Sequence, residues 1–340
     1  MTTPSNSTTK VKNGGVIPKG PARTKFLVTA LIVPLLILAA LTLYPLTWLD
    51  QLPALVPSHW DASGQPDSFE APMGLALTML AIGGATIAAL WGLGFALGKE
   101  LLTRRILAGT NVFMAVLLGG IVLGTLSASR TGAAADMNID MFIFTSMGVG
   151  VAAGFLVAYL VRPEPKVLAT GHPDIKSPRT ALSDLEVGVW VTRTDSKTGY
   201  IIAGANVVLM IGIMVLSQLW WTSILFLGLS VVMIIMFAWD VRVDATGLTV
   251  VSVARAPKRH LPLDEIESAE VAQISAMGDF GGYGLRTGFS GSTGVILRSG
   301  TALQVNLSGN RTFYITIDDA EEGAALLNTL IDRARPATGA

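Results

Sequence analysis

Four side chains that could bind a metal ion or transfer a proton lie close together early in the chain. His59, Asp61, Asp67 and Glu70 fall within twelve residues. Imidazole and carboxylate groups are suitable ligands for zinc and other divalent cations. An imidazole can also act as a general base, but that role needs a nucleophile and an oxyanion site beside it.

The pattern around these residues favours a structural role over either kind of chemistry. His59, Asp61 and Asp67 remain weak metal candidates, because a single histidine without cysteine matches no standard metal-binding spacing. Ser58 and Ser63 add hydroxyl groups nearby without forming a catalytic arrangement. We therefore expect no cofactor, with His59 and Trp60 at a membrane interface and Asp61 capping a turn.

The segment that carries these residues has the composition of an ordered loop. It reads LPALVPSHWDASGQPD, Leu52–Asp67. Prolines stiffen its entry, residues 61–64 predict a turn, and Pro66-Asp67 is expected to lead into a helix. We interpret the loop as a recognition element whose residues are Pro53, Pro57, His59, Trp60, Asp61, Gly64, Pro66 and Asp67.

Composition places this loop in a membrane protein. The chain has 340 residues, of which 51% are hydrophobic and 14% charged, whereas soluble domains have about 25% charged residues. Six segments are apolar over the length that a membrane-spanning helix needs. They are Phe26–Trp48, Met73–Leu97, Ile106–Ser127, Met141–Val161, Gly199–Ser217 and Trp220–Trp239. The absence of cysteine excludes disulfides, iron–sulfur clusters and thiol nucleophiles.

The distribution of basic residues predicts the orientation. Fourteen Lys and Arg residues lie in the 1–25 tail and the 98–105 and 162–198 loops, against Arg130 alone in the 49–72 and 128–140 loops. Positive loops face the cytoplasm, so we expect a plasma-membrane protein with both termini inside and the acidic 49–72 loop outside. Five aromatic residues fall at expected helix ends, as interfacial aromatics do: Tyr44, Trp48, Trp220, Trp221 and Trp239.

Small and polar residues within the spans indicate how the helices pack. Gly94/Gly98, Gly120/Gly124 and Gly150/Gly154 have the spacing that allows close helix contact. We expect packing inside one bundle rather than homodimerisation. Asn111 and Asn206 are the most polar residues inside the spans, and the absence of ionisable residues there argues against a pump or coupled transporter.

After Trp239 the pattern changes to short strands. Residues 241–244 and 248–254 predict a hairpin, 266–274 a strand, 295–298 and 302–307 a second hairpin, and 313–317 a further strand. Asp318 as N-cap with Glu321 predicts a closing helix with a capping box. These elements favour a small barrel or sandwich covered by a helix. Zero net charge for the whole chain gives no sign of nucleic-acid binding.

The segment 277–294 contains seven glycines among aromatic residues. Phe280, Tyr283, Arg286 and Phe289 are its candidate contact residues. Two interpretations stay open, a mobile loop that touches lipid or a partner chain, and a long hairpin loop whose glycines meet backbone constraints.

The loop after the first span resembles a signature of the bacterial membrane family called domain of unknown function 1648. The matching residues are Leu52, Pro53, Val56, Pro57, His59, Trp60, Gly64, Pro66 and Asp67. The resemblance covers residues 26–97, although Glu70-Ala71-Pro72 departs from the basic or aromatic residue often found there. The family includes an immunity protein against a sporulation-delay toxin, so the resemblance implies sensing or immunity.

The second half is similar to bacterial membrane proteins that carry a pleckstrin-homology-like domain. In these proteins a strand with a Glu, Trp and Arg pattern precedes a helical hairpin and a β domain. Glu186, Trp190 and Arg193 occupy those positions here. The resemblance implies that residues 185–193 pair with the cytoplasmic sheet.

The expected architecture is a six-helix integral membrane bundle with a cytoplasmic, mainly-β pleckstrin-homology-like domain and a C-terminal helix. Its parts are a disordered tail (1–25), a four-helix domain (26–161), a linker (162–198), a transmembrane hairpin (199–239) and the β domain (240–335). We expect a non-enzymatic sensor or toxin-immunity protein, with the bilayer, an extracytoplasmic peptide and a cytoplasmic protein as partners. The alternatives are a metal-dependent envelope enzyme and a transport accessory protein.

Overall fold

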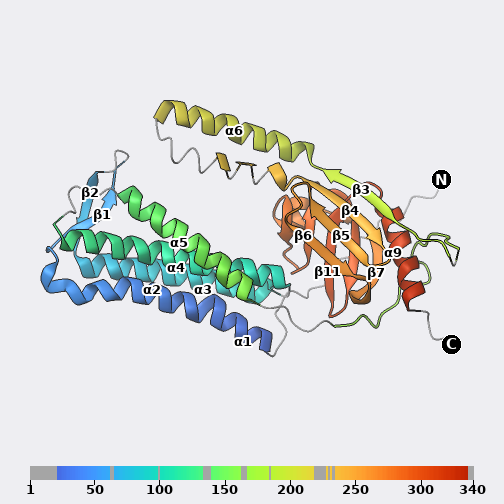
Figure 1. The fold of residues 1–340 in the computed structure, drawn as a ribbon, viewed down its shortest axis with the longest axis horizontal. Helices are drawn as coiled ribbons and strands as arrows, with labels where there is room; N and C mark the ends of the chain where they lie inside the picture. Colours follow the sequence, from blue (N-terminus) through green and yellow to red (C-terminus); the bar gives the residue numbers. More distant parts are fainter. Residues whose placement is uncertain are drawn as a thin grey trace. The chain divides into compact units, whose positions relative to one another are not determined.

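The described residues fall into two compact units, one within 21–161 and one within 167–335. The structure is a computed structural model (Figure 1). It describes residues 21–61, 65–98, 100–132, 139–161, 167–183, 185–217, 227–228, 230–231 and 234–335. Each unit is described by itself.

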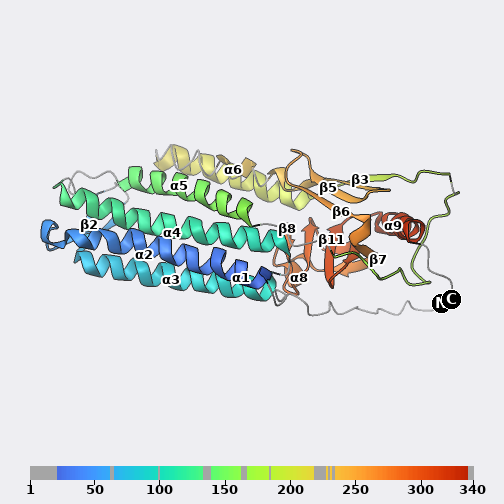
Figure 2. The same cartoon turned by 60° about the horizontal axis from the view of Figure 1, so that its bottom comes forward.

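The first unit is a bundle of long apolar helices (Figures 1 and 2). Its first helix is a continuous run of α1 (Pro21–Leu27), a π-helical turn η1 (Val28–Ile32), α2 (Val33–Leu43) and a 3-10 segment η2 (Tyr44–Gln51). Three more helices follow, α3 (Pro72–Leu97), α4 (Leu101–Arg130) and α5 (Ile139–Leu160). Between the first two helices lie two short strands, β1 (Val56–Trp60) and β2 (Pro66–Glu70).

Among the described residues, five helices are long and apolar enough to cross a membrane, which suggests that the protein is membrane-associated. Four belong to the bundle, and the fifth lies in α6 (Lys197–Ser217) of the second unit. Of the sixth expected span, Trp220–Trp239, residues 220–226, 229 and 232–233 lie outside the described residues, including Trp220 and Trp221. Residues 1–20 of the expected disordered tail, 1–25, also lie outside them. Residues 21–25 are helical in α1, so for these five residues the prediction of disorder is wrong.

A proline explains the irregular turn in the first helix. Pro34 has no amide hydrogen and cannot pair with the carbonyl of Ala30 four residues earlier. Asn111 of α4 supplies the missing donor, because its Nδ2 lies 2.6 Å from Ala30 O and 3.2 Å from Ile87 O of α3. One buried amide thus links three helices.

The glycine pairs pack inside the bundle, as predicted. The backbones of α4 and α5 meet at Gly109 and Gly154, where a Cβ added to Gly154 would lie 2.7 Å from Gly109 O. Gly120 faces Ser146 in the same pair of helices, and Gly150 faces Phe113. Small residues at these positions allow the two helices to approach closely.

The second unit contains two mainly antiparallel sheets and a C-terminal helix (Figure 1). One sheet has the order β3 (Trp190–Asp195), β4 (Ala238–Asp244), β5 (Gly247–Ser252), β6 (Lys258–Pro262). The other has the order β7 (Ile266–Ile274), β10 (Gly300–Leu307), β11 (Arg311–Thr316), β9 (Thr293–Ile296), β8 (Gly284–Thr287). α9 (Ala320–Ala334) contributes Ala324, Leu327 and Ile331 to the core between them.

Several strand predictions are confirmed. β7 has the predicted bounds, and β4 and β5 form the expected hairpin. β3 pairs with β4 from Trp190↔Val243 to Asp195↔Ala238, so part of the 185–193 segment joins the sheet as expected. Trp239 was predicted at a membrane interface, and this prediction is wrong. Trp239 lies in β4 with its side chain fully buried in the core.

Two further predictions about this unit are wrong. Residues 295–298 and 302–307 do not form a hairpin, because β9 pairs in parallel with β11, and β10 lies between β7 and β11. Asp318 does not cap the last helix, whose N-cap is Asp319 without a side-chain cap hydrogen bond. Asp318 instead accepts a hydrogen bond of 2.5 Å from Arg298.

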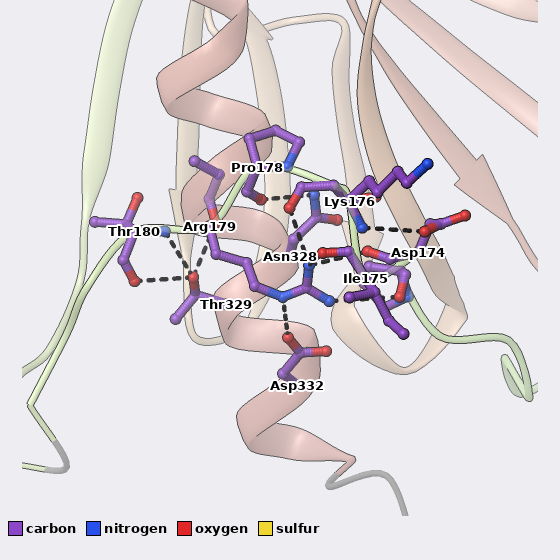
Figure 3. A network of polar contacts seen from close by, with 12 residues as sticks. Asp174, Ile175, Lys176, Pro178, Arg179, Thr180, Asn328, Thr329 and Asp332 are labelled. Carbon is purple, nitrogen blue, oxygen red and sulfur yellow. Dashed lines mark hydrogen bonds and ion pairs between the residues drawn. The ribbon is translucent and has the colours of Figure 1, made fainter.

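Residues 174–180 of the linker before β3 are hydrogen-bonded to α9 (Figure 3). Arg179 donates from Nε to Asp332 at 2.6 Å and from a terminal nitrogen to the carbonyls of Asp174 and Ser177 at 2.9 Å. Asn328 donates to Pro178 O at 3.1 Å. Residues 174–180 are therefore part of the β unit rather than a free connection.

Acidification is expected to weaken the β4–β5 hairpin at Asp244. Hydrogen bonds from Thr246, and then the neighbouring Arg242, lower the pKa of Asp244 to about 2 from its usual 3.8. The folded-state pKa is the lower one, so the stabilisation is present above about pH 4 and is lost as the pH falls towards 2. Because the side chain is 20% exposed and water screens its interactions, we expect the stabilisation that is lost to be about 1 kcal/mol.

The measurement is hydrogen exchange of residues 238–252 in the full chain between pH 4.5 and 2.5, corrected for intrinsic rates. Asp244→Asn should remove the extra acid sensitivity. The same acid sensitivity in Asp244→Asn as in the parent would show that another group is responsible.

Candidate functional site

The loop singled out in the sequence forms a short β-hairpin on the bundle. β1 and β2 pair in antiparallel fashion from Val56↔Glu70 to Trp60↔Pro66, with irregular register on both sides of His59. Asp61 N donates to Gln65 O at 2.9 Å, and Asp61 Oδ1 accepts from Gln65 N at 3.0 Å. Asp61 therefore holds the ends of the expected turn, whose residues 62–64, Gly64 among them, lie outside the described residues.

Pro66 and Asp67 precede the next helix as expected, but they lie in a short strand that was not predicted. Both belong to β2, and α3 begins at Pro72 after Glu70 and Ala71. The proline at this position is tolerated because β2 is an edge strand of a two-stranded sheet. The extended backbone places Asp67 opposite β1 instead of on a helix.

The hairpin brings His59 and Asp67 together. His59 Nδ1 and Asp67 Oδ1 lie 2.6 Å apart, with the two side chains 69% and 45% exposed. Asp61 accepts a hydrogen bond within its own turn. Among the described residues, no three His, Asp or Glu side chains form a group suited to a metal ion, so a metal here would have two ligands from the hairpin.

Metal analysis of the purified chain would test the enzyme alternative. A metal-dependent enzyme predicts one equivalent of metal that is lost in His59→Ala. Only trace metal in both the parent and His59→Ala would exclude a metal-dependent enzyme.

The base of the hairpin is anchored in the bundle core. Val56 is fully buried against Leu75 of α3 and against Val122 and Leu126 of α4. Trp60 has a buried indole Nε1, and no described residue accepts its hydrogen. A buried donor of this kind normally has a partner. The anchored base makes the hairpin an ordered element, as the prolines and turn residues predicted.

A cavity of about 600 Å³ lies beside the hairpin. Its lining combines apolar side chains with Arg130 at the end of α4, and the named residues are Asp50, Gln51, Leu52, Pro53, Leu55, Pro57, Phe69, Ser129, Arg130 and Gly132. Leu55 and Phe69 are more than half exposed at its rim. A concave apolar site with a few fixed polar groups is typical of a binding site.

Arg130 is held in place at this cavity. Its Nε donates to Gln51 Oε1 at 2.6 Å, and its guanidinium lies 4.9 Å from the ring centre of Trp48. Cation–π contact and a side-chain hydrogen bond together fix the charge. In the sequence, Arg130 is distinguished only as the single basic residue of the expected outward loops. That feature alone could have indicated a role for it at this site.

The glycine-rich segment 277–294 fits the hairpin interpretation better than the mobile-loop one, because β8 pairs antiparallel with β9 and Gly281, Gly282, Gly284 and Gly291 have positive φ. It contains a short helix, α8 (Ala276–Phe280), and the strand β8. Phe280 is buried and packs edge-on against Tyr314, and Tyr283 packs partly against the core. Arg286 and Phe289 remain exposed, so these two are the available contact residues of the four candidates.

Fold and site together define a membrane-associated protein with a helical N-terminal region, an ordered β-hairpin between its first two spans, and a mainly-β C-terminal region. Residues 27–84 match the family described as Domain of unknown function (DUF1648), which confirms the resemblance seen in the loop signature. The match covers the first span, the hairpin and part of α3. No curated protein and no solved structure matches the chain.

Proposed function

We propose that this protein is a non-enzymatic integral membrane protein of the envelope-sensing or toxin-immunity type. Its hairpin 56–70 and the adjoining cavity recognise an extracytoplasmic ligand. The observation that carries the proposal is the 600 Å³ cavity, where the exposed Leu55 and Phe69 meet the fixed charge of Arg130. Exposed apolar side chains beside a concave surface are typical of an interaction site.

The proposed location is the plasma membrane, crossed several times, with both termini in the cytoplasm. The supporting observation is the excess of Lys and Arg in the tail and in the loops at 98–105 and 162–198. This orientation leaves the hairpin on the outer face. The long apolar helices agree with membrane insertion.

The ligand that best suits this surface is a peptide with both apolar and basic side chains. Leu55 and Phe69 offer apolar contacts. The acidic residues near the cavity outnumber Arg130 and would attract a cation, and they are Asp50, Asp61, Asp67 and Glu70. Charge complementarity of this kind speeds association and selects the partner.

The β unit would bind a cytoplasmic protein and relay occupancy of the hairpin. Its two sheets with a C-terminal helix agree with the pleckstrin-homology-like fold implied by the sequence resemblance. A cavity of about 510 Å³ lies where Trp190 of β3 meets α9. Its rim carries the exposed Val187 and the acidic Glu186 and Glu322. An apolar floor with acidic edges suits a partner segment with basic residues.

Substitution of the hairpin pair is the direct test of recognition. His59→Ala or Asp67→Ala should lower protection or signalling at least about tenfold, because the contact between His59 and Asp67 near the tip of the hairpin is lost. The amount of protein in membranes should not change, since exposed ion pairs contribute at most about 1 kcal/mol to stability.

The assay compares a deletion strain of the native host with strains that carry the parent, each variant or the control Ser68→Ala. Growth is measured over a dilution series of peptides secreted by the same species. If both variants fail to accumulate in membranes, or protect as well as the parent, the hairpin is not the recognition element.

A further inference from the structure

A second concave surface lies on the bundle, away from the hairpin. A groove of about 590 Å³ runs between α4 and α5. It is lined by Leu102, Arg105, Ile106, Gly109, Thr110 and Phe113 of α4 and by Val151, Gly154, Phe155, Ala158 and Tyr159 of α5. At about 1.5 Å per helical residue, the α4 stripe from residue 102 to 113 is about 16 Å long.

The floor of the groove is the contact between Gly109 and Gly154, where the absence of side chains leaves a hollow. Its walls are apolar and exposed, since Ile106 is 54% and Phe155 is 74% exposed. Both helices are long and apolar enough to cross a membrane. A groove of this composition in a membrane-spanning segment faces hydrocarbon and accepts an acyl chain without losing any hydrogen bond.

One end of the groove is polar. Arg105 lies at this end, one turn after the start of α4. Its Nε donates to the carbonyl of Val161, just beyond the end of α5, at 2.9 Å. In the part of the chain that the structure describes, Nε is the only nitrogen of Arg105 with a hydrogen-bond acceptor. Tyr159, 79% exposed, lines the same groove. Arginine with an aromatic neighbour at the end of a span is typical of the headgroup region.

We propose that this groove binds one phospholipid molecule, with an acyl chain along Gly109, Gly154 and Phe155 and the phosphate on Arg105. The charge of the guanidinium and the apolar length of the groove match the two parts of that ligand. An anionic headgroup is favoured over a zwitterionic one, because no headgroup cation then opposes Arg105. The proposal is independent of ligand recognition by the hairpin.

The test is native mass spectrometry of the full chain, purified in detergent and supplied with dioleoyl phosphatidylglycerol. We expect one retained lipid per chain. Arg105→Gln should lower its occupancy at least about tenfold, and Arg105→Lys should lower it less, because a single charge replaces the planar fork. Dioleoylglycerol, which lacks the phosphate, should not be retained by the parent.

Arg23→Gln is the matched control. Arg23 belongs to the same unit and lies 4.3 Å from the ring centre of Phe95, outside the groove. We expect the control to keep the lipid. Retention that is equal in the parent and Arg105→Gln, with both chains folded, would overturn the proposal.

A second copy of the chain in the groove would also overturn the proposal. The chain has no cysteine, so an introduced cysteine reports contact between copies directly. Phe155→Cys should form no disulfide between copies in membranes. Efficient cross-linking would place protein rather than lipid in the groove.

Discussion

Replacing Asn328 with leucine should lower the free energy of unfolding of the β unit by about 3 kcal/mol. Asn328 is fully buried in α9. Its Oδ1 accepts from Ala269 N at 2.8 Å, and its Nδ2 donates to Ala269 O at 2.9 Å. β7 is an edge strand, so this side chain takes the place of a neighbouring strand. Leucine would leave two buried backbone groups without partners, at about 1–3 kcal/mol each.

Hydrogen exchange of the full chain measures this effect. Faster exchange is expected in residues 266–274 and in residues 174–180, because Asn328 also donates to Pro178 O. Glu321→Gln, on the exposed face of the same helix, is the control. Unchanged protection of both segments in Asn328→Leu would mean that the edge of β7 does not depend on this amide.

Replacing Gly154 with valine should strongly destabilise the contact between α4 and α5. The new Cβ would lie 2.7 Å from the backbone oxygen of Gly109, and a backbone atom cannot move without its helix. α4 and α5 would have to separate, and overpacking of this kind costs about 1–3 kcal/mol. We expect Gly154→Val to lower the free energy of unfolding by about 3 kcal/mol.

Thermal unfolding of the detergent-purified chain measures the loss, with Gly148→Val as control. Gly148 lies in the same helix with no atom within 4 Å of an added Cβ, so it shares the helix-propensity cost but not the clash. A melting temperature lowered equally in the two variants would show that α4 and α5 do not meet at Gly154.

The elements that sequence predicted well are those fixed by local pattern. The four bundle spans were located because apolar length alone defines them. β7 has its predicted bounds, although burial along it is irregular, with Ala269 buried and Val271 exposed. The hairpin was predicted as an ordered loop because proline and turn residues restrict the backbone directly.

The features that were missed depend on residues far apart in the chain. Arg130 meets Gln51 across 79 positions, and Asn111 meets Ala30 across 81. The parallel pairing of β9 with β11 is likewise invisible to local periodicity, which gives strands but not their neighbours. Trp239 was misassigned because the apolar run of the preceding segment continues into the first two residues of β4, Ala238 and Trp239.

Removing the apolar rim of the cavity tests the central claim, recognition by the hairpin, most directly. Leu55→Ser combined with Phe69→Ser changes two exposed side chains, so the bundle should fold as before. The measurement is the inhibitory dose of secreted peptide for the complemented deletion strain. The parent should raise this dose at least about tenfold over the deletion strain, and the double variant should return it to the level of the deletion strain at equal membrane abundance. A double variant that protects as well as the parent would contradict the account.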